Sequence, residues 1–137
     1  MDTLGWLNVT IPQLLRFEDV ALLALRLMVA VVFGTSGYFH ARDPVGRAKS
    51  VELTPTATRA LGLAELAGSA GLVTGILIQL AALGLMLVGL GAIGKKITVW
   101  KTGFWGEKAS GWHYDLMLLT MNLVIVCTAG GDLVTSF

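Results

Sequence analysis

The segment that decides the fold is ALGLAELAGSAGLVTGILIQLAALGLMLVGLGAIG, Ala60 to Gly94, which carries one charged side chain, Glu65. As a single helix, its 35 residues would be about 52 Å long, whereas a hydrocarbon core of about 30 Å needs about 20 residues. Thr74, Gly75 and Gln79 are the most polar residues or the weakest helix formers near its middle. The segment therefore predicts two antiparallel membrane helices joined by a tight turn between Thr74 and Gln79.

Two further apolar segments flank this pair. Val20 to Phe39 is interrupted by one charge, Arg26, and Trp112 to Ala129 is uncharged except at its start. Of the 137 residues, 55% are hydrophobic and 14% charged, against about 25% charged in soluble chains. We predict an all-α fold, a four-transmembrane-helix bundle. Its spans are Val20 to Phe39, Ala60 to Thr74, Leu77 to Gly94 or on past Lys96, and Tyr114 to Gly130.

The chain divides into residues 1–19, an N-terminal segment, and residues 20–137, the transmembrane domain. The N-terminal segment combines apolar side chains with acidic ones and lacks the basic leader and cleavage site of a secretory signal. We expect it to be retained and to lie in the membrane interface, where Pro12 prevents one continuous helix.

Charge distribution predicts the orientation. With four spans, one side of the membrane holds eight Lys and Arg side chains and the other holds only Arg16. Because short cytoplasmic loops carry excess Lys and Arg, we place both long loops in the cytoplasm and both termini outside it. The expected location is the inner (cytoplasmic) membrane, crossed several times. The eight residues are Arg42, Arg47, Lys49, Arg59, Lys95, Lys96, Lys101 and Lys108.

Composition also excludes several classes of function. The net charge of +1 gives no basic field for nucleic acid, and the single cysteine, Cys127, excludes an internal disulfide or a CxxC redox pair. The two histidines, His40 and His113, lie on separate helices without metal-ligand spacing, so we expect no metal site. No phosphate loop or dinucleotide motif is present, and we expect no cofactor bound by this chain alone, although a quinone is a candidate ligand.

Small residues predict how the helices associate. Lipid tails are as apolar as leucine, so helix association in a bilayer relies on close packing between small side chains. We expect helix packing at five positions on the second and third spans. They are Ala67, Gly71, Gly75, Gly84 and Gly91.

Arg26 and Glu65 need an explanation, because an ionisable group inside a span costs about 3 kcal/mol. The first span runs inward and the second outward, so the two charges lie about 9 Å inside opposite faces and direct pairing is disfavoured. For Arg26 we retain two alternatives, structural snorkelling and contact with an anion or a carbonyl group.

Glu65 leans towards the cytoplasmic end, near His40, His113 and Asp115. Such a cluster would suit a quinone or proton site. In the alternative interpretation, Glu65 is merely hydrogen-bonded and the neighbouring cations reach to lipid headgroups. The aromatic residues near the same boundary are either membrane anchors or a headgroup-level site for a flat ring. They are Tyr38, Trp100, Trp105, Trp112 and Tyr114.

Several short motifs together resemble a known family. The first span has an early Arg followed by Phe and Gly, the second begins with Gly-Leu-Ala-Glu-Leu-Ala-Gly, and the fourth opens on His-Tyr-Asp and ends in two glycines. These motifs lie at Arg26, Phe33, Gly34, Gly37, Gly62 to Gly68, His113 to Asp115, and Gly130 and Gly131. Over about residues 24–137 the chain resembles the DoxX family of small four-helix membrane proteins.

The resemblance implies a membrane subunit, since the namesakes of the family are associated with quinone-linked sulfur oxidation such as thiosulfate to quinone electron transfer. Arg26 and Glu65 are the matching positions to watch. The last turn departs from the family pattern, in which Ser and Asp tend to follow the glycines, because Asp132 follows directly here and Ser136 lies further on.

Three hypotheses follow from the sequence. The first is an accessory or anchoring subunit of a larger membrane oxidoreductase or respiratory assembly, with Glu65 and its neighbours facing quinone or protons. The second is a purely structural helix-packing subunit, and the third is a small-solute permease acting as an oligomer. All three give the chain the lipid bilayer as a partner, and the first two add other membrane subunits.

Overall fold

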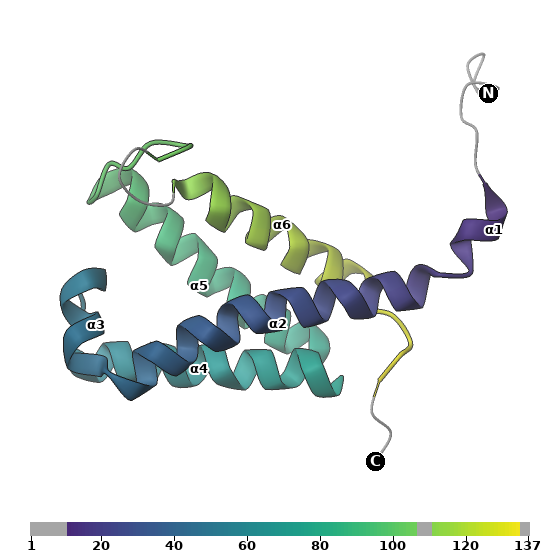
Figure 1. Ribbon diagram of the computed structural model, residues 1–137, viewed down its shortest axis with the longest axis horizontal. Helices are drawn as coiled ribbons and strands as arrows, with labels where there is room; N and C mark the ends of the chain where they lie inside the picture. Colours follow the sequence, from purple (N-terminus) through teal and green to yellow (C-terminus); the bar gives the residue numbers. More distant parts are fainter. Residues whose placement is uncertain (1–10, 107–110, 135–137) are drawn as a thin grey trace.

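The computed structural model describes residues 11–106 and 111–134, which form six helices and no strand (Figure 1). Residues 1–10 of the predicted interfacial segment and Lys108 lie outside the described residues. The helices are α1 Pro12–Leu15, α2 Glu18–Arg42, α3 Pro44–Val51, α4 Pro55–Thr74, α5 Ile78–Thr98 and α6 Trp112–Thr128.

The central apolar segment divides where the sequence predicts. Helix α4 ends at Thr74 and α5 begins at Ile78. Gly75 and Leu77 have φ angles of 81° and 51°, a left-handed conformation that stops α4, and the Gly75 amide donates to the Gly71 carbonyl at 2.9 Å. The predicted turn between Thr74 and Gln79 is confirmed.

Other boundaries differ from the predicted spans for local reasons. Helix α4 begins at Pro55 rather than Ala60, because Thr54 caps it by accepting from the Ala57 amide at 3.1 Å and proline is favoured in the first turn. Helix α6 ends at Thr128, two residues before the predicted end, because Ala129 and the glycines after it have positive φ. Helix α3 was not predicted; Asp43 caps it.

The long helices form two pairs. Helix α2 packs along α4, and α5 packs along α6, with weaker contact between the pairs. Figure 1 shows the pairs meeting near the chain termini and separating towards the opposite end, where α3 and the segment after α5 lie. The described part of the molecule is therefore closed at one end and open at the other.

Helix length and surface composition fit a bilayer. Among the described helices, α2 and α5 are long and apolar enough to cross a membrane, and α6 is a shorter apolar helix. Their outer faces carry large apolar side chains that lie largely exposed, whereas Val29, Leu72, Leu85 and Ile125 form the buried core. The most exposed outer positions include Val31, Leu80, Leu87 and Met117.

Two glycines allow α2 and α4 to pack with their backbones in contact. A Cβ atom on Gly37 would lie 2.7 Å from the Gly62 carbonyl oxygen, and one on Gly62 would lie 2.6 Å from the Ala41 amide nitrogen. Real side chains do not approach backbone this closely, so the contact needs glycine at both positions.

The small residues expected to pack fall into two groups. Added Cβ atoms at Gly71 and Gly75 would approach Ala81 at 3.0 Å and Val134 at 2.7 Å. Gly84 and Gly91 have nothing within 4 Å of an added Cβ, and Ala67 is exposed. Packing at these last three positions stays a prediction that would need contacts outside this chain.

We predict that Gly37→Ala destabilises the protein by about 1 to 3 kcal/mol, because the new methyl group overpacks the α2–α4 contact. Gly84→Ala is the matched control, since an added Cβ there meets nothing within 4 Å. Thermal unfolding in detergent micelles would measure both variants. Equal midpoints for the two would contradict the close contact.

Candidate functional site

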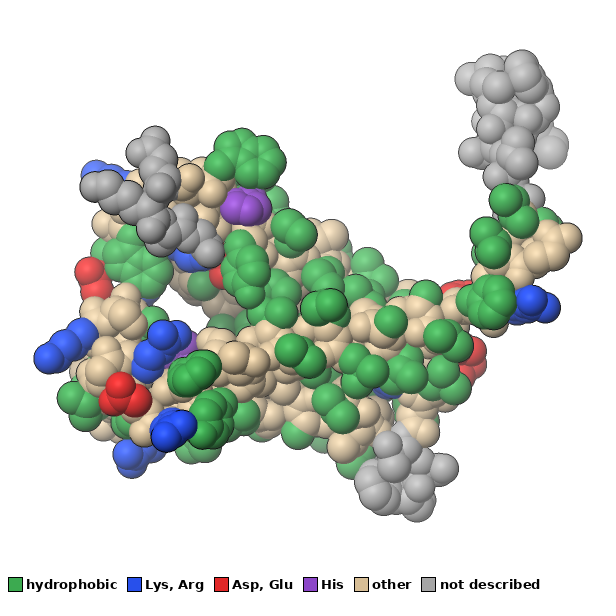
Figure 2. Space-filling view, viewed as in Figure 1, with side chains coloured by type: hydrophobic (Ala, Val, Ile, Leu, Met, Phe, Trp, Pro, Cys, Tyr) green, Lys and Arg blue, Asp and Glu red, His purple; other side chains and the backbone are tan. Residues whose placement is uncertain are grey.

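A cleft of about 640 Å³ lies between the two helix pairs at the open end. Figure 2 shows the molecule hollowed there, between the lobe that carries α3 and the lobe formed by the end of α5, with Lys and Arg side chains nearby. Apolar side chains from α2, α5 and α6 form most of the walls, including Phe33, Val88 and Leu118. The cleft therefore suits a ligand with a large apolar part.

His40 and Glu65 form one polar wall. His40 Nδ1 lies 3.4 Å from Glu65 Oε2 and 3.3 Å from the Ser36 hydroxyl oxygen, and both residues of the pair are buried. The pair can meet because α2 and α4 are antiparallel and each glycine of the close contact faces one member of the pair. A Cβ added to Gly37 would lie 2.9 Å from the Glu65 Cβ. A Cβ added to Gly62 would lie 2.8 Å from the His40 Cβ. The helix packing thus brings an imidazole against a carboxylate.

Lys96 and Asp115 form a second polar wall, from α5 and α6. The Lys96 Nζ lies 2.7 Å from Asp115 Oδ2, and the side chains are 14% and 11% exposed. The same ammonium lies 5.7 Å from the centre of the Tyr114 ring. A charge that is this poorly hydrated is costly unless it is paired, so the ion pair keeps both groups stable in the cleft.

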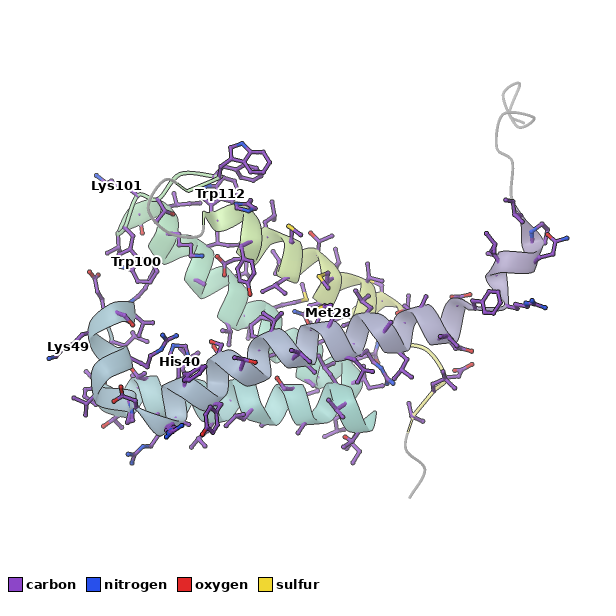
Figure 3. All side chains as sticks on the ribbon, viewed as in Figure 1. Met28, His40, Lys49, Trp100, Lys101 and Trp112 are labelled. Atoms are coloured by element: carbon purple, nitrogen blue, oxygen red, sulfur yellow. The ribbon has the colours of Figure 1, made fainter. Side chains whose placement is uncertain are left out.

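Lys95 connects the two lobes at the mouth of the cleft. Its Nζ donates to the carbonyl of Val51, the last residue of α3, and, at 2.9 Å, to the carbonyl of Glu52, the residue that follows. It also lies 5.8 Å from the centre of the Trp100 ring. Figure 3 shows His40 and Trp100 on opposite sides of the opening. Lys95 therefore sets the separation between α3 and α5.

His113 does not join this cluster. Its Nδ1 lies 2.8 Å from the Phe104 carbonyl oxygen, and its ring lies 5.1 Å from the Trp105 ring centre. The reason is geometric: Asp115 is two residues along α6, about 200° around the helix axis, so the two side chains face different directions. The structure brings together Glu65, His40 and Asp115 and leaves His113 outside.

Arg26 lies at the closed end, far along α2 from His40, and is completely buried. It donates from Nη2 to the carbonyl of Leu133, in the segment that follows α6. Nearby, the Asp132 amide donates to Asp19 Oδ1 at 2.9 Å. Arg26 and Glu65 thus have different partners, and the carbonyl that Arg26 contacts belongs to its own chain.

The family model for DoxX matches residues 21–101, which include Arg26, His40, Glu65 and Lys96. The chain belongs to the DoxX family. It is therefore a DoxX membrane protein, and most of the cleft lies within the matched residues, while Asp115 lies beyond them. No curated protein and no solved structure matches the chain.

Some residues of the cleft in this DoxX protein escaped sequence reasoning. Arg47 lines the cleft from α3, a helix that the sequence analysis did not predict. Ser36 contacts His40 one helical turn away, and this spacing alone could have revealed it. Trp100 and Tyr114, expected as anchors or as part of a ring site, both line the cleft.

We predict that Arg26→Met releases residues 129–134 from α2, because the substitution removes the buried guanidinium that holds the Leu133 carbonyl. Amide hydrogen exchange in this segment should become about tenfold faster or more, as expected for loss of a charged hydrogen bond. Arg42→Met is the matched control on the same helix, since Arg42 contacts only Tyr38 among the described hydrogen-bond partners. Unchanged exchange in residues 129–134 would show that Arg26 does not retain the segment.

Proposed function

We propose that α2, α4, α5 and α6 cross the inner membrane, with the open end of the cleft in the cytoplasm and both termini outside. Basic side chains support this orientation, because most of those of the described residues gather at the open end (Figure 2). Arg16, which directly follows α1, and the buried Arg26 lie towards the other end. Lys and Arg favour the cytoplasmic side of a membrane. The open-end residues are Arg42, Arg47, Lys49, Arg59, Lys95, Lys96 and Lys101.

This orientation predicts the accessibility of cysteines introduced at Lys101 and Arg16 in a Cys127→Ser background. A membrane-impermeant maleimide should label the Arg16→Cys protein from outside the cell and leave the Lys101→Cys protein unlabelled until the cells are lysed. Labelling of Arg16→Cys shows that the reagent reaches the outer face, and labelling of Lys101→Cys after lysis shows that this cysteine can react. Labelling of Lys101→Cys in intact cells would reverse the orientation.

We further propose that the protein is an accessory subunit of a membrane oxidoreductase and that its cleft holds the ring of a quinone. The observation that carries this proposal is the combination of apolar walls with two enclosed acid–base pairs, His40–Glu65 and Lys96–Asp115. Ligand sites are typically apolar with a few polar groups that fix orientation. A quinone has an apolar tail, a flat ring and oxygens that form hydrogen bonds, and the cleft offers partners for each part.

The residues of the cleft can support proton exchange. Reduction of a quinone to a quinol takes up two electrons and two protons, and oxidation releases them. The sequence contains no redox motif, so the electrons would come from a redox centre in a partner subunit. His40 and Glu65 lie close enough to pass a proton between them, which is the role of a general acid–base pair.

A purely structural subunit is the second candidate, favoured by one observation. A groove of about 640 Å³ between α4 and α5 is lined by small and apolar residues, including Gly68, Gly71 and Gly84. Small residues on an outer helix face allow another helix to approach closely. In this interpretation the His40–Glu65 pair only stabilises the bundle.

Glu65→Gln separates the two candidates. We expect the variant to assemble normally, but electron transfer to quinone in native membranes should fall about 100-fold, because the amide cannot exchange protons. Glu18→Gln at the closed end of α2 is the matched control. Unchanged electron transfer in Glu65→Gln would favour the structural subunit.

A further inference from the structure

The second nitrogen of His40 has no partner although it is buried. His40 is 5% exposed, and its Nε2 finds no hydrogen-bond partner among the described residues. Buried polar groups are nearly always hydrogen-bonded, so an unpaired one that borders a cleft indicates a ligand. His40 lines the cleft together with Arg47, whose buried Nε also lacks a partner in the described part of the chain.

The partners of Nδ1 decide what Nε2 can bind. Glu65 Oε2, at 3.4 Å, is an acceptor when the carboxylate is ionised, so the proton of a neutral imidazole lies on Nδ1. Nε2 then carries a lone pair and can only accept. Glu65 is therefore a positioning residue that fixes the tautomer, while His40 contacts the ligand.

The other polar groups of the cleft are mostly donors that already have partners. Lys95 donates to the carbonyls of Val51 and Glu52, and Lys96 is paired with Asp115. Among the described residues that line the cleft, two buried groups have neither a hydrogen-bond nor an ion-pair partner, an acceptor at His40 Nε2 and a donor at Arg47 Nε. A ring carbonyl can accept from Arg47 but cannot donate to His40, whereas ring hydroxyls can do both.

We propose that the cleft binds the dihydroxy form of a quinone, the quinol, more tightly than the diketone form, with a ring hydroxyl donating to His40 Nε2. This inference rests on the proposed function, since it names the form of the same ligand. The diketone would leave the buried lone pair of Nε2 without a donor, a penalty that corresponds to about a tenfold difference in affinity.

The test is calorimetric titration of the full chain, purified from its own membrane in mild detergent and kept free of oxygen. The probes are a decyl-substituted 1,4-benzoquinol and the matching 1,4-benzoquinone. We expect the quinol to bind about tenfold more tightly. A quinone that binds as tightly as the quinol, or more tightly, would overturn the inference.

Two substitutions assign the preference to Nε2. His40→Asn keeps an amide near the position of Nδ1, close to Glu65, but removes the distant acceptor, so quinol affinity should fall about tenfold and the preference should disappear. His40→Gln extends a polar group towards the position of Nε2 and should retain part of the preference. His113→Asn is the matched control, because His113 lies outside the cleft.

The outcomes separate this inference from the proposed function. If both ring forms bind and His40→Asn leaves the quinol preference unchanged, the role of Nε2 is wrong while the quinone site stands. If neither form binds to the folded wild-type chain, the quinone site and the inference both fail. If His40→Asn does not fold, His40→Gln decides. This variant retains an acceptor near the position of Nε2, so complete loss of the preference for quinol would overturn the inference.

Discussion

The structure depends on one close contact, the crossing of α2 and α4 at Gly37 and Gly62, where any side chain would collide with backbone. In a bilayer, such contacts replace the hydrophobic effect as the source of helix association. At the same crossing Gly37 faces the Cβ of Glu65 and Gly62 faces that of His40, so the packing that stabilises the fold also builds the polar wall of the cleft. Because α2 is occupied by α4, helices α5 and α6 pack mainly on each other, and the space between the two pairs remains open at one end.

Buried charged side chains have different kinds of partner at the two ends of the molecule. At the closed end, Arg26 donates from Nη2 to a carbonyl of the chain segment that folds back after α6, and Asp19 accepts from the same segment. At the open end, Lys96 forms an ion pair with Asp115 and the His40 imidazole lies against Glu65, in both cases across helices and at the border of a cavity. The first arrangement fixes the segment after α6 against α2, and the second leaves polar groups along the cleft wall.

Sequence reasoning located the elements better than it located their neighbours. The break between Thr74 and Gln79 could be predicted because a helix across the whole segment would exceed the bilayer, and length is readable from sequence. That Glu65 and Arg26 would have separate partners followed from the helix directions. Helix α3 escaped prediction because its start depends on the Asp43 cap rather than on apolar periodicity. The exclusion of His113 depends on the rotation of α6 about its own axis, which packing fixes and hydropathy does not reveal.

The link from Lys95 to the carbonyls of Val51 and Glu52, at the end of α3, joins the two sides of the cleft through a long, unbranched side chain. Such a side chain can change rotamer without disturbing the apolar core, since Val29, Leu72, Leu85 and Ile125 all lie away from the cleft mouth. The width of the cleft mouth can thus change without a change in the helix packing of the core. If the cleft holds a quinone as proposed, one bundle could admit rings with substituents of different size, and ligand tolerance would vary with the residue at position 95 while the fold stays the same.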